Sequence, residues 1–138
     1  YIRFMKLKIL LFFLFLPKLI FADVIKVNNE EIIELMQNGV PIVDIRASNE
    51  WVDTGVIDDS NLLTFFDKDG KYNIDLWLSK LERLIDIDKP FILICRSGKR
   101  SGRASKYLDE QFNYEKLYDA KNGMVSWISA KNKTVKPN

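Results

Sequence analysis

Histidine is absent from this chain of 138 residues, and cysteine occurs only once, at position 95. Without histidine, a cysteine–histidine protease site and a histidine metal centre are both excluded. A single cysteine cannot form an internal disulfide, and it supplies too few ligands for an ordinary zinc site. We therefore expect no metal, and any chemistry of Cys95 must proceed without an imidazole base.

Extremes of composition and charge are also missing. Hydrophobic residues make up 47% of the chain and charged residues 29%, which is typical of one ordinary globular domain. All 19 acidic residues follow Ala22, so a chain that begins at residue 23 has 17 cationic residues and a net charge of −2. Nothing in this balance favours a nucleic acid as partner. The cations that precede residue 23 are Arg3, Lys6, Lys8 and Lys18.

The first 22 residues have the order of a secretory signal peptide. Lysines follow Met5, an apolar run covers residues 9–16, and the small residue Ala22 provides a cleavage position. A membrane anchor is the alternative, but the apolar run is short for a bilayer, and Pro17 and Lys18 interrupt it. We expect residues 1–22 to be a signal peptide with an upstream extension at 1–4, and no stable membrane span after cleavage.

Beyond residue 23, short apolar runs alternate with helical patterns. Asn28 and Glu31 have the spacing of a capping box at the start of the first helix. This alternation predicts the α/β class, with an open, mainly parallel sheet and helices on both faces. We expect strands at 24–27, 41–45, 61–66, 90–95 and 116–118, and helices from 29, near 49–53, from 73, at 101–112 and at 124–131.

The segment ICRSGKRSGR, residues 94–103, surrounds Cys95 with positive charge and small residues. Ligands of open α/β sheets bind where strands end and helices begin. With Gly98 in the loop, consecutive backbone N–H groups can turn inward and form an anion nest, and the following helix adds its dipole. A thiolate above such a nest is stabilised, so we expect a reactive nucleophile. An inert buried thiol and a loop that binds phosphate without covalent chemistry are the alternatives.

Three motifs resemble the rhodanese-like family of sulfurtransferases. CRSGKRS at 95–101 is similar to the Cys-x-x-Gly-x-Arg-Ser/Thr active-site loop of that family. VDIRASNEWVDTGVI at 43–57 resembles its first motif, and NGMVSWI at 122–128 resembles its closing Gly-x-x-x-Trp segment. On this resemblance we assign a rhodanese-like domain to residues 23–131. The lysine-rich composition after Ala130 leads us to expect a flexible tail at 132–138.

The resemblance implies a five-stranded parallel sheet and a persulfide cycle without an organic cofactor. Cys95 would take sulfur from thiosulfate or a polysulfide and pass it to a thiophilic acceptor such as cyanide or a thiol. Asp44 and Arg46 would brace the site rather than contact substrate, and Ser101 would also cap the following helix. The residues expected to hold the anionic donor are Arg96, Ser97, Gly98, Lys99, Arg100 and Ser101.

The first motif departs from the family after Gly55. The usual Gly-His-Ile-x-Gly-Ala is replaced by residues 55–60, in which Val56 removes an imidazole and Asp59 replaces a glycine. Aspartate tolerates left-handed turn geometry better than most residues. We expect these changes to affect the turn and the shape of the substrate, not the thiol chemistry.

Two other functions use a similar loop. Cysteine phosphatases and arsenate reductases resemble one another in a Cys-x5-Arg loop, whereas Arg100 gives Cys-x4-Arg here, which is too short to embrace a phosphoryl group. A non-enzymatic sulfur carrier that serves a partner protein would need the same Cys95 and the same nest, so this alternative stays open.

Export combined with sulfane-sulfur chemistry fits the periplasm.

Overall fold

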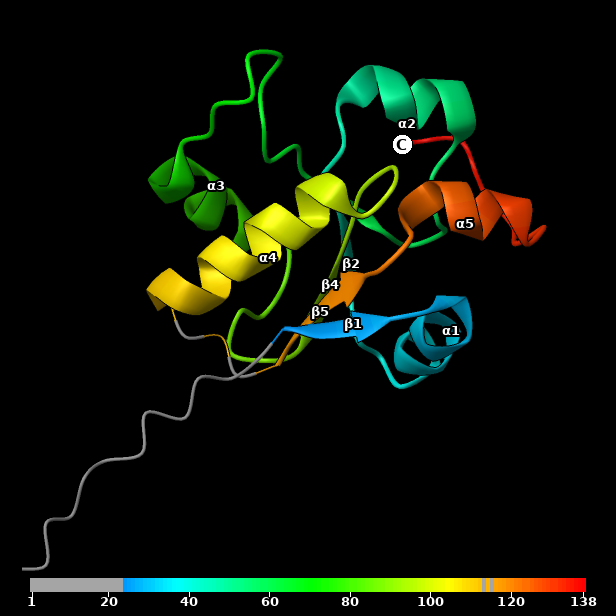
Figure 1. Ribbon diagram of the computed structural model, residues 1–138, viewed down its shortest axis with the longest axis horizontal. Helices are drawn as coiled ribbons and strands as arrows, with labels where there is room; N and C mark the ends of the chain where they lie inside the picture. Colours follow the sequence, from blue (N-terminus) through cyan, green and yellow to red (C-terminus); the bar gives the residue numbers. More distant parts are fainter. Residues whose placement is uncertain (1–23, 113, 115) are drawn as a thin grey trace, which may run out of the picture.

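The computed structural model describes residues 24–138 except 113 and 115, and this part of the chain folds around one sheet of five parallel strands. Their order is β1-β5-β4-β2-β3 (Figure 1). The predicted α/β class and open parallel sheet are therefore confirmed. The strands are β1 (Ile25–Val27), β2 (Ile42–Asp44), β3 (Asn61–Leu62), β4 (Phe91–Ile94) and β5 (Leu117–Ala120). The helices are α1 (Asn29–Gln37), α2 (Ser48–Thr54), α3 (Ile74–Leu81), α4 (Lys99–Phe112) and α5 (Gly123–Ser129).

Helices cover both faces of the sheet. Figure 1 shows α3 and α4 on one side, α1 and α5 on the other, and α2 beyond the edge where the strands end. All four residues of β4 are buried, as expected for an apolar central strand covered on both sides. Leu93 and Cys95 pack in the core beneath α3 and α4, whereas Ile92 and Ile94 pack in the core beneath α1 and α5. Alternation along β4 thus directs Cys95 toward α4.

The predicted capping box at the start of α1 is confirmed. The Glu31 backbone N–H donates to Asn28 Oδ1 at 2.9 Å, and the Asn28 N–H donates to Glu31 Oε1 at 3.2 Å. These bonds satisfy N–H groups that an uncapped helix end would leave without partners. The residues 28 to 31 therefore fix where the chain leaves β1.

The strand expected at 61–66 ends already at Leu62. Beyond it, the Leu63 N–H still donates to Asp44 O at 3.0 Å and the Phe65 N–H to Ile45 O at 3.2 Å, but the ladder is not continuous. Phe65 and Phe66 are buried in the core on the α3 side. The apolar run was misinterpreted because these rings anchor a loop to the core instead of extending a strand.

Helix α4 begins at Lys99, two residues before the predicted start. The Gly102 N–H donates to the Gly98 carbonyl at 3.0 Å, which makes Gly98 the residue that precedes the helix. The connection from β4 to α4 is therefore shorter than the sequence suggested. Lys99, Arg100 and Ser101, expected in a loop, form the first helical turn.

Residues 132–138, which we expected to form a flexible tail, are attached to the domain at two points. Val56 and Val135 exchange two backbone hydrogen bonds of 2.9 Å in an antiparallel bridge, and Trp127 Nε1 donates to Lys133 O at 3.0 Å. Asp59 has φ 60°, so it keeps the left-handed turn that glycine would allow.

The predicted signal peptide at 1–22 lies outside the described residues. None of the helices described here has the length and apolar character needed to cross a membrane.

Candidate active site

Cys95 lies directly after β4, and only 1% of its surface is exposed. The backbone N–H groups of Gly98 and Ser101 donate to its Sγ at 3.2 and 3.3 Å. The thiol itself donates to Ser101 Oγ at 3.4 Å. The expected anion nest is therefore present, and it uses the N-terminal turn of α4, where the helix dipole favours negative charge.

Ser101 does not cap α4, contrary to the prediction. The residue lies inside the first turn of α4, after Gly98, Lys99 and Arg100, so its N–H group is one of those that a helix leaves free. Both its N–H and its hydroxyl contact Cys95 Sγ. Ser101 is thus a direct neighbour of the sulfur and not a helix cap.

The turn that carries the nest is packed against the connection between β5 and α5. Gly98 has φ +93°, and a Cβ atom at this position would overlap the Lys121 carbonyl oxygen. Gly123 has φ +59°, and a Cβ atom there would overlap the carbonyls of Cys95 and Arg96. Only glycine fits either position without a shift of backbone. The closing motif of the sequence therefore supports the active-site turn directly.

The first N–H groups of α5 complete this support. Met124 N donates to Cys95 O, and Val125 N donates to Arg96 O, both at 2.9 Å. The carbonyl groups that follow β4 consequently have partners although the sheet ends there. The backbone on both sides of the Cys95 side chain is held by α4 and α5 together.

Arg100 and Glu50 form a bidentate ion pair between α4 and α2. Arg100 donates from Nη1 to Glu50 Oε2 at 2.7 Å and from Nη2 to Oε1 at 2.6 Å. The hydrogen bond from Arg100 lowers the pKa of Glu50 below its ordinary value, although partial burial opposes the change. Glu50 in turn raises the pKa of Arg100. The guanidinium of Arg100 is thus engaged by Glu50, and its expected contact with substrate stays a prediction.

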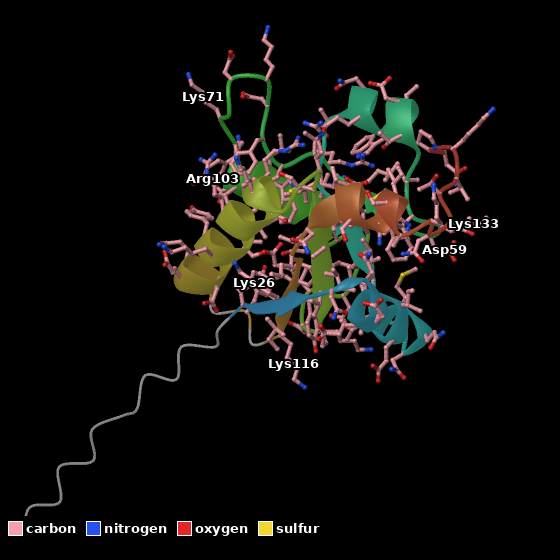
Figure 2. The ribbon with its side chains drawn as sticks, turned by 45° about the vertical axis from the view of Figure 1, so that its right-hand side comes forward. Lys26, Asp59, Lys71, Arg103, Lys116 and Lys133 are labelled. Atoms are coloured by element: carbon pink, nitrogen blue, oxygen red, sulfur yellow. The ribbon has the colours of Figure 1, made fainter. Side chains whose placement is uncertain are left out.

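Arg96, Ser97 and Lys99 lie at the surface of the turn. Their side chains are exposed, and within the described residues neither Arg96 nor Lys99 forms an ion pair. A third cation, Arg103, lies one turn further along α4 (Figure 2), with its guanidinium 4.8 Å from the centre of the Phe66 ring. These three cations give the neighbourhood of Cys95 a local positive charge, which suits an anionic substrate.

Asp44 and Arg46 form a buried pair, with the Arg46 Nη2 and Asp44 Oδ2 atoms 2.7 Å apart. Arg46 also donates to Thr54 Oγ1 at 2.8 Å and to the Gly55 carbonyl at 3.0 Å, at the end of α2. Because the two side chains are only 1% exposed, they do not reach bulk solvent. The pair fixes the end of α2 and with it Glu50, and the bracing role of the two residues in the chemistry stays a prediction.

The comparison with known families agrees with these features. The model of the rhodanese-like domain matches residues 28–130. The chain belongs to the rhodanese-like domain family. Among curated proteins, it is 48% identical over 48 residues to "Putative sulfurtransferase YtwF" of Bacillus subtilis (strain 168). That match spans 35% of this chain and 44% of the relative, so less than half of the relative's length is covered.

Solved structures share the fold of this rhodanese-like domain at low sequence identity. A rhodanese-related protein from Thermoplasma volcanium has a TM-score of 0.62 and 21% identity, over 82% of this chain and 99% of that one. The polysulfide-sulfur transferase homodimer of Wolinella succinogenes has a TM-score of 0.62 and 20% identity, over 85% and 82% of the two chains. These similarities show the shared fold, whereas the family match and the curated relative support a sulfurtransferase-type family.

Two acidic residues of this rhodanese-like domain were not predicted as site residues. Glu50 was included only as part of the first motif, because its partner Arg100 is 50 residues away in the sequence and no local pattern pointed to the pair. Asp119 is buried in β5, beyond the predicted end of that strand at 118, and burial raises its pKa. A charged residue within an apolar run was the signal that could have identified it. Within residues 24–138, apart from 113 and 115, no three potential ligand side chains gather to hold a metal ion.

Proposed function

We propose that this rhodanese-like domain transfers sulfane sulfur through a persulfide on Cys95. The observation that supports the proposal is the pair of backbone N–H groups, from Gly98 and Ser101, that donate to Sγ. These donors stabilise negative charge on sulfur without a neighbouring imidazole. Their position is fixed by the fold, so they are ready before any substrate arrives.

The proposed cycle has two displacement steps. The Cys95 thiolate attacks the outer sulfur of thiosulfate; a sulfur–sulfur bond forms, and the bond inside thiosulfate breaks as its electron pair leaves with sulfite. A thiophilic acceptor such as cyanide then attacks the terminal sulfur, which leaves as thiocyanate and regenerates the thiolate. A polysulfide can replace thiosulfate as donor. Arg96 and Lys99, exposed and without ion pairs among the described residues, would attract these anions.

The position of Arg100 argues against phosphatase chemistry. A phosphatase arginine must be free to bind the phosphoryl oxygens, whereas both Nη atoms of Arg100 are bonded to Glu50. In the longer phosphatase loop, Cys-x5-Arg, the arginine would stand at position 101 when counted from Cys95, and this chain has Ser101 there. The pair with Glu50 therefore favours sulfur transfer over phosphoryl transfer.

The test is the intact mass of the protein after incubation with thiosulfate or polysulfide, before and after addition of cyanide. We expect a gain of one sulfur atom that disappears as thiocyanate forms, and no gain in Cys95→Ser. Rapid thiocyanate production supports an enzyme, and stable loading without turnover supports the sulfur carrier. The absence of any adduct with both donors would contradict sulfur transfer.

Export to the periplasm is a further part of this proposal, supported by the signal-like order of residues 1–22. Expression of the whole chain in a Gram-negative host, followed by fractionation, tests it. We expect the periplasmic fraction to contain a protein whose intact mass corresponds to a chain that begins at residue 23. A protein that keeps its first 22 residues and sediments with membranes would support the anchor instead.

A further inference from the structure

Asp119 is a buried carboxyl group without an assigned role. It is 1% exposed, and its Oδ1 atom is buried with no hydrogen-bond partner among the described residues. Buried carboxylates are normally paired, because burial of an isolated charge is costly. In β5 it points to the same side as Leu117, which packs in the core beneath α4. A buried carboxyl group with one oxygen unpaired, beneath the active-site helix, calls for a chemical explanation.

The carboxyl group lies against the first turns of α4. A Cβ atom built at Gly102 would be 3.5 Å from Asp119 Oδ2, so the small residue provides the room for close approach. Burial raises the pKa of Asp119, while the Ser101 hydroxyl and the charge of Lys26 lower it, and burial has the larger effect. Lys26, which Figure 2 labels on β1, is by register the partner of Asp119 in β5.

Ser101 connects this carboxyl group to the catalytic sulfur. Its Oγ accepts a hydrogen bond from the Cys95 thiol at 3.4 Å. The hydroxyl proton of Ser101 has only a weak partner in Gly98 O, also at 3.4 Å, so it can turn toward another acceptor. Asp119 Oδ2 approaches Gly102, the residue next to Ser101, and the Ser101 hydroxyl lowers the pKa of Asp119, so this carboxyl group is the acceptor within reach.

We propose that Asp119 is a positioning residue that takes up the proton of the Cys95 thiol through the Ser101 hydroxyl. The S–H bond breaks as Ser101 Oγ accepts the proton, and the original Ser101 O–H proton passes to an Asp119 carboxylate oxygen. The negative charge moves from Asp119 to Sγ, where the N–H groups of Gly98 and Ser101 stabilise it. No proton enters or leaves the protein in this step.

The surroundings of Asp119 suit this exchange. From β1 it faces Lys26, from β4 it faces Leu93 and the end of the strand at Cys95, and from α4 it faces Ser101 and Gly102. Lys26 and Cys95 are the ionisable groups in this set. In a chain without histidine, a carboxyl group with a raised pKa is a better proton acceptor than an ordinary aspartate. Two groups that share one proton titrate as a pair, in two steps.

The proposal deepens the proposed function, since it supplies Cys95 with a proton acceptor, but its test requires no sulfur transfer. The ultraviolet absorbance of the thiolate is titrated against pH, with Cys95→Ser as the blank. The rate of alkylation by iodoacetamide, a small neutral reagent, is followed over the same range. We expect two steps in the wild-type protein and loss of the lower step in Asp119→Asn.

Ser105→Ala is the matched control, because it removes another buried hydroxyl from the same face of α4, one that has no hydrogen bond among the described residues. It should keep both steps. A single step in the wild-type protein, or a lower step that persists in Asp119→Asn, would overturn the proposal. Circular dichroism at each pH ensures that only folded protein is compared. A protein that shows the two steps and yet accepts no sulfur would refute the proposed function alone.

Discussion

The guanidinium of Arg100 holds both carboxylate oxygens of Glu50, at 2.6 and 2.7 Å. This contact joins two helices that are far apart in the sequence, and it places the first turn of α4 against α2. Glu50 Oε2 also accepts from the Ala47 N–H at 3.1 Å, so one carboxylate both caps α2 and anchors the active-site turn.

Glu50→Gln should therefore lower the free energy of unfolding at neutral pH by about 1–2 kcal/mol, through loss of charge-assisted hydrogen bonds. Because folding lowers the pKa of Glu50 from its ordinary value of 4.5, the wild-type advantage is complete above that value. It should disappear as the pH falls through the lower pKa of the folded state. Urea unfolding at several pH values measures this change.

The control for this experiment is Glu110→Gln. Glu110 is exposed and pairs with Lys106 at 3.9 Å, so its loss should cost little at any pH. A constant difference between Glu50→Gln and wild type from neutral to acid pH would show that the ion pair does not account for the stabilisation.

Gly98→Ala should disrupt the anion nest. The new Cβ would overlap the Lys121 carbonyl, and the residue would also have to keep a positive φ. Gly70→Ala separates these effects, because Gly70 has φ +74° but open space around its Cβ position. We expect about 1 kcal/mol of destabilisation at Gly70 and about 3 kcal/mol or more at Gly98, with loss of sulfur loading only at Gly98. Equal costs would mean that the close approach to Lys121 has no energetic role.

Asp44→Asn should destabilise the domain by about 3–5 kcal/mol, because it leaves Arg46 as a buried charge without its partner. The double variant Asp44→Leu/Arg46→Met should lose less than the two single changes together, since no charge is left unpaired. Chemical unfolding of the wild type, Asp44→Leu, Arg46→Met and the double variant measures the coupling. Alkylation of Cys95 in the folded single variant should stay close to wild type if the pair only braces the site, and a large loss would indicate a direct role in the chemistry.

Val135→Pro should lower the melting temperature, since proline cannot donate to the Val56 carbonyl. Loss of this hydrogen bond is expected to cost about 1–2 kcal/mol. Val135→Ala keeps the backbone bonds and reports the side chain alone. If the two variants melt together, the antiparallel bridge contributes nothing beyond the packing of the valine.

The parts of the fold that depend on local chemistry were predictable from the sequence. The Asn28–Glu31 capping box and the continuous apolar run of β4 each involve residues close together in the chain, whereas the change of the turn expected at Asp59 is not seen in its φ of 60°. The anion nest could also be expected, because Gly98 and a following helix are enough to propose it. These features confirm that short-range patterns define the site's position.

The remaining features depend on contacts between distant segments. Phe65 and Phe66 read as strand residues, but both are buried in the core, where the Phe65 ring packs against Trp77 of α3 and against Phe66, and the ladder ends early. Ser101 was expected to cap a helix that in fact begins two residues before it. Asp119 became visible only when β5 placed it beneath α4, next to a glycine 17 residues earlier in the chain.

The bonds from Met124 N to Cys95 O and from Val125 N to Arg96 O make α5 part of the active-site turn. Segments joined in this way open as one cooperative unit. The amides of Gly98, Ser101, Met124 and Val125 should therefore exchange their hydrogens with solvent at similar rates, and slowly. Mutations on α5 far from the sulfur would then change how often the active-site turn opens, and with it the time for which the persulfide proposed on Cys95 survives attack by thiols in solution.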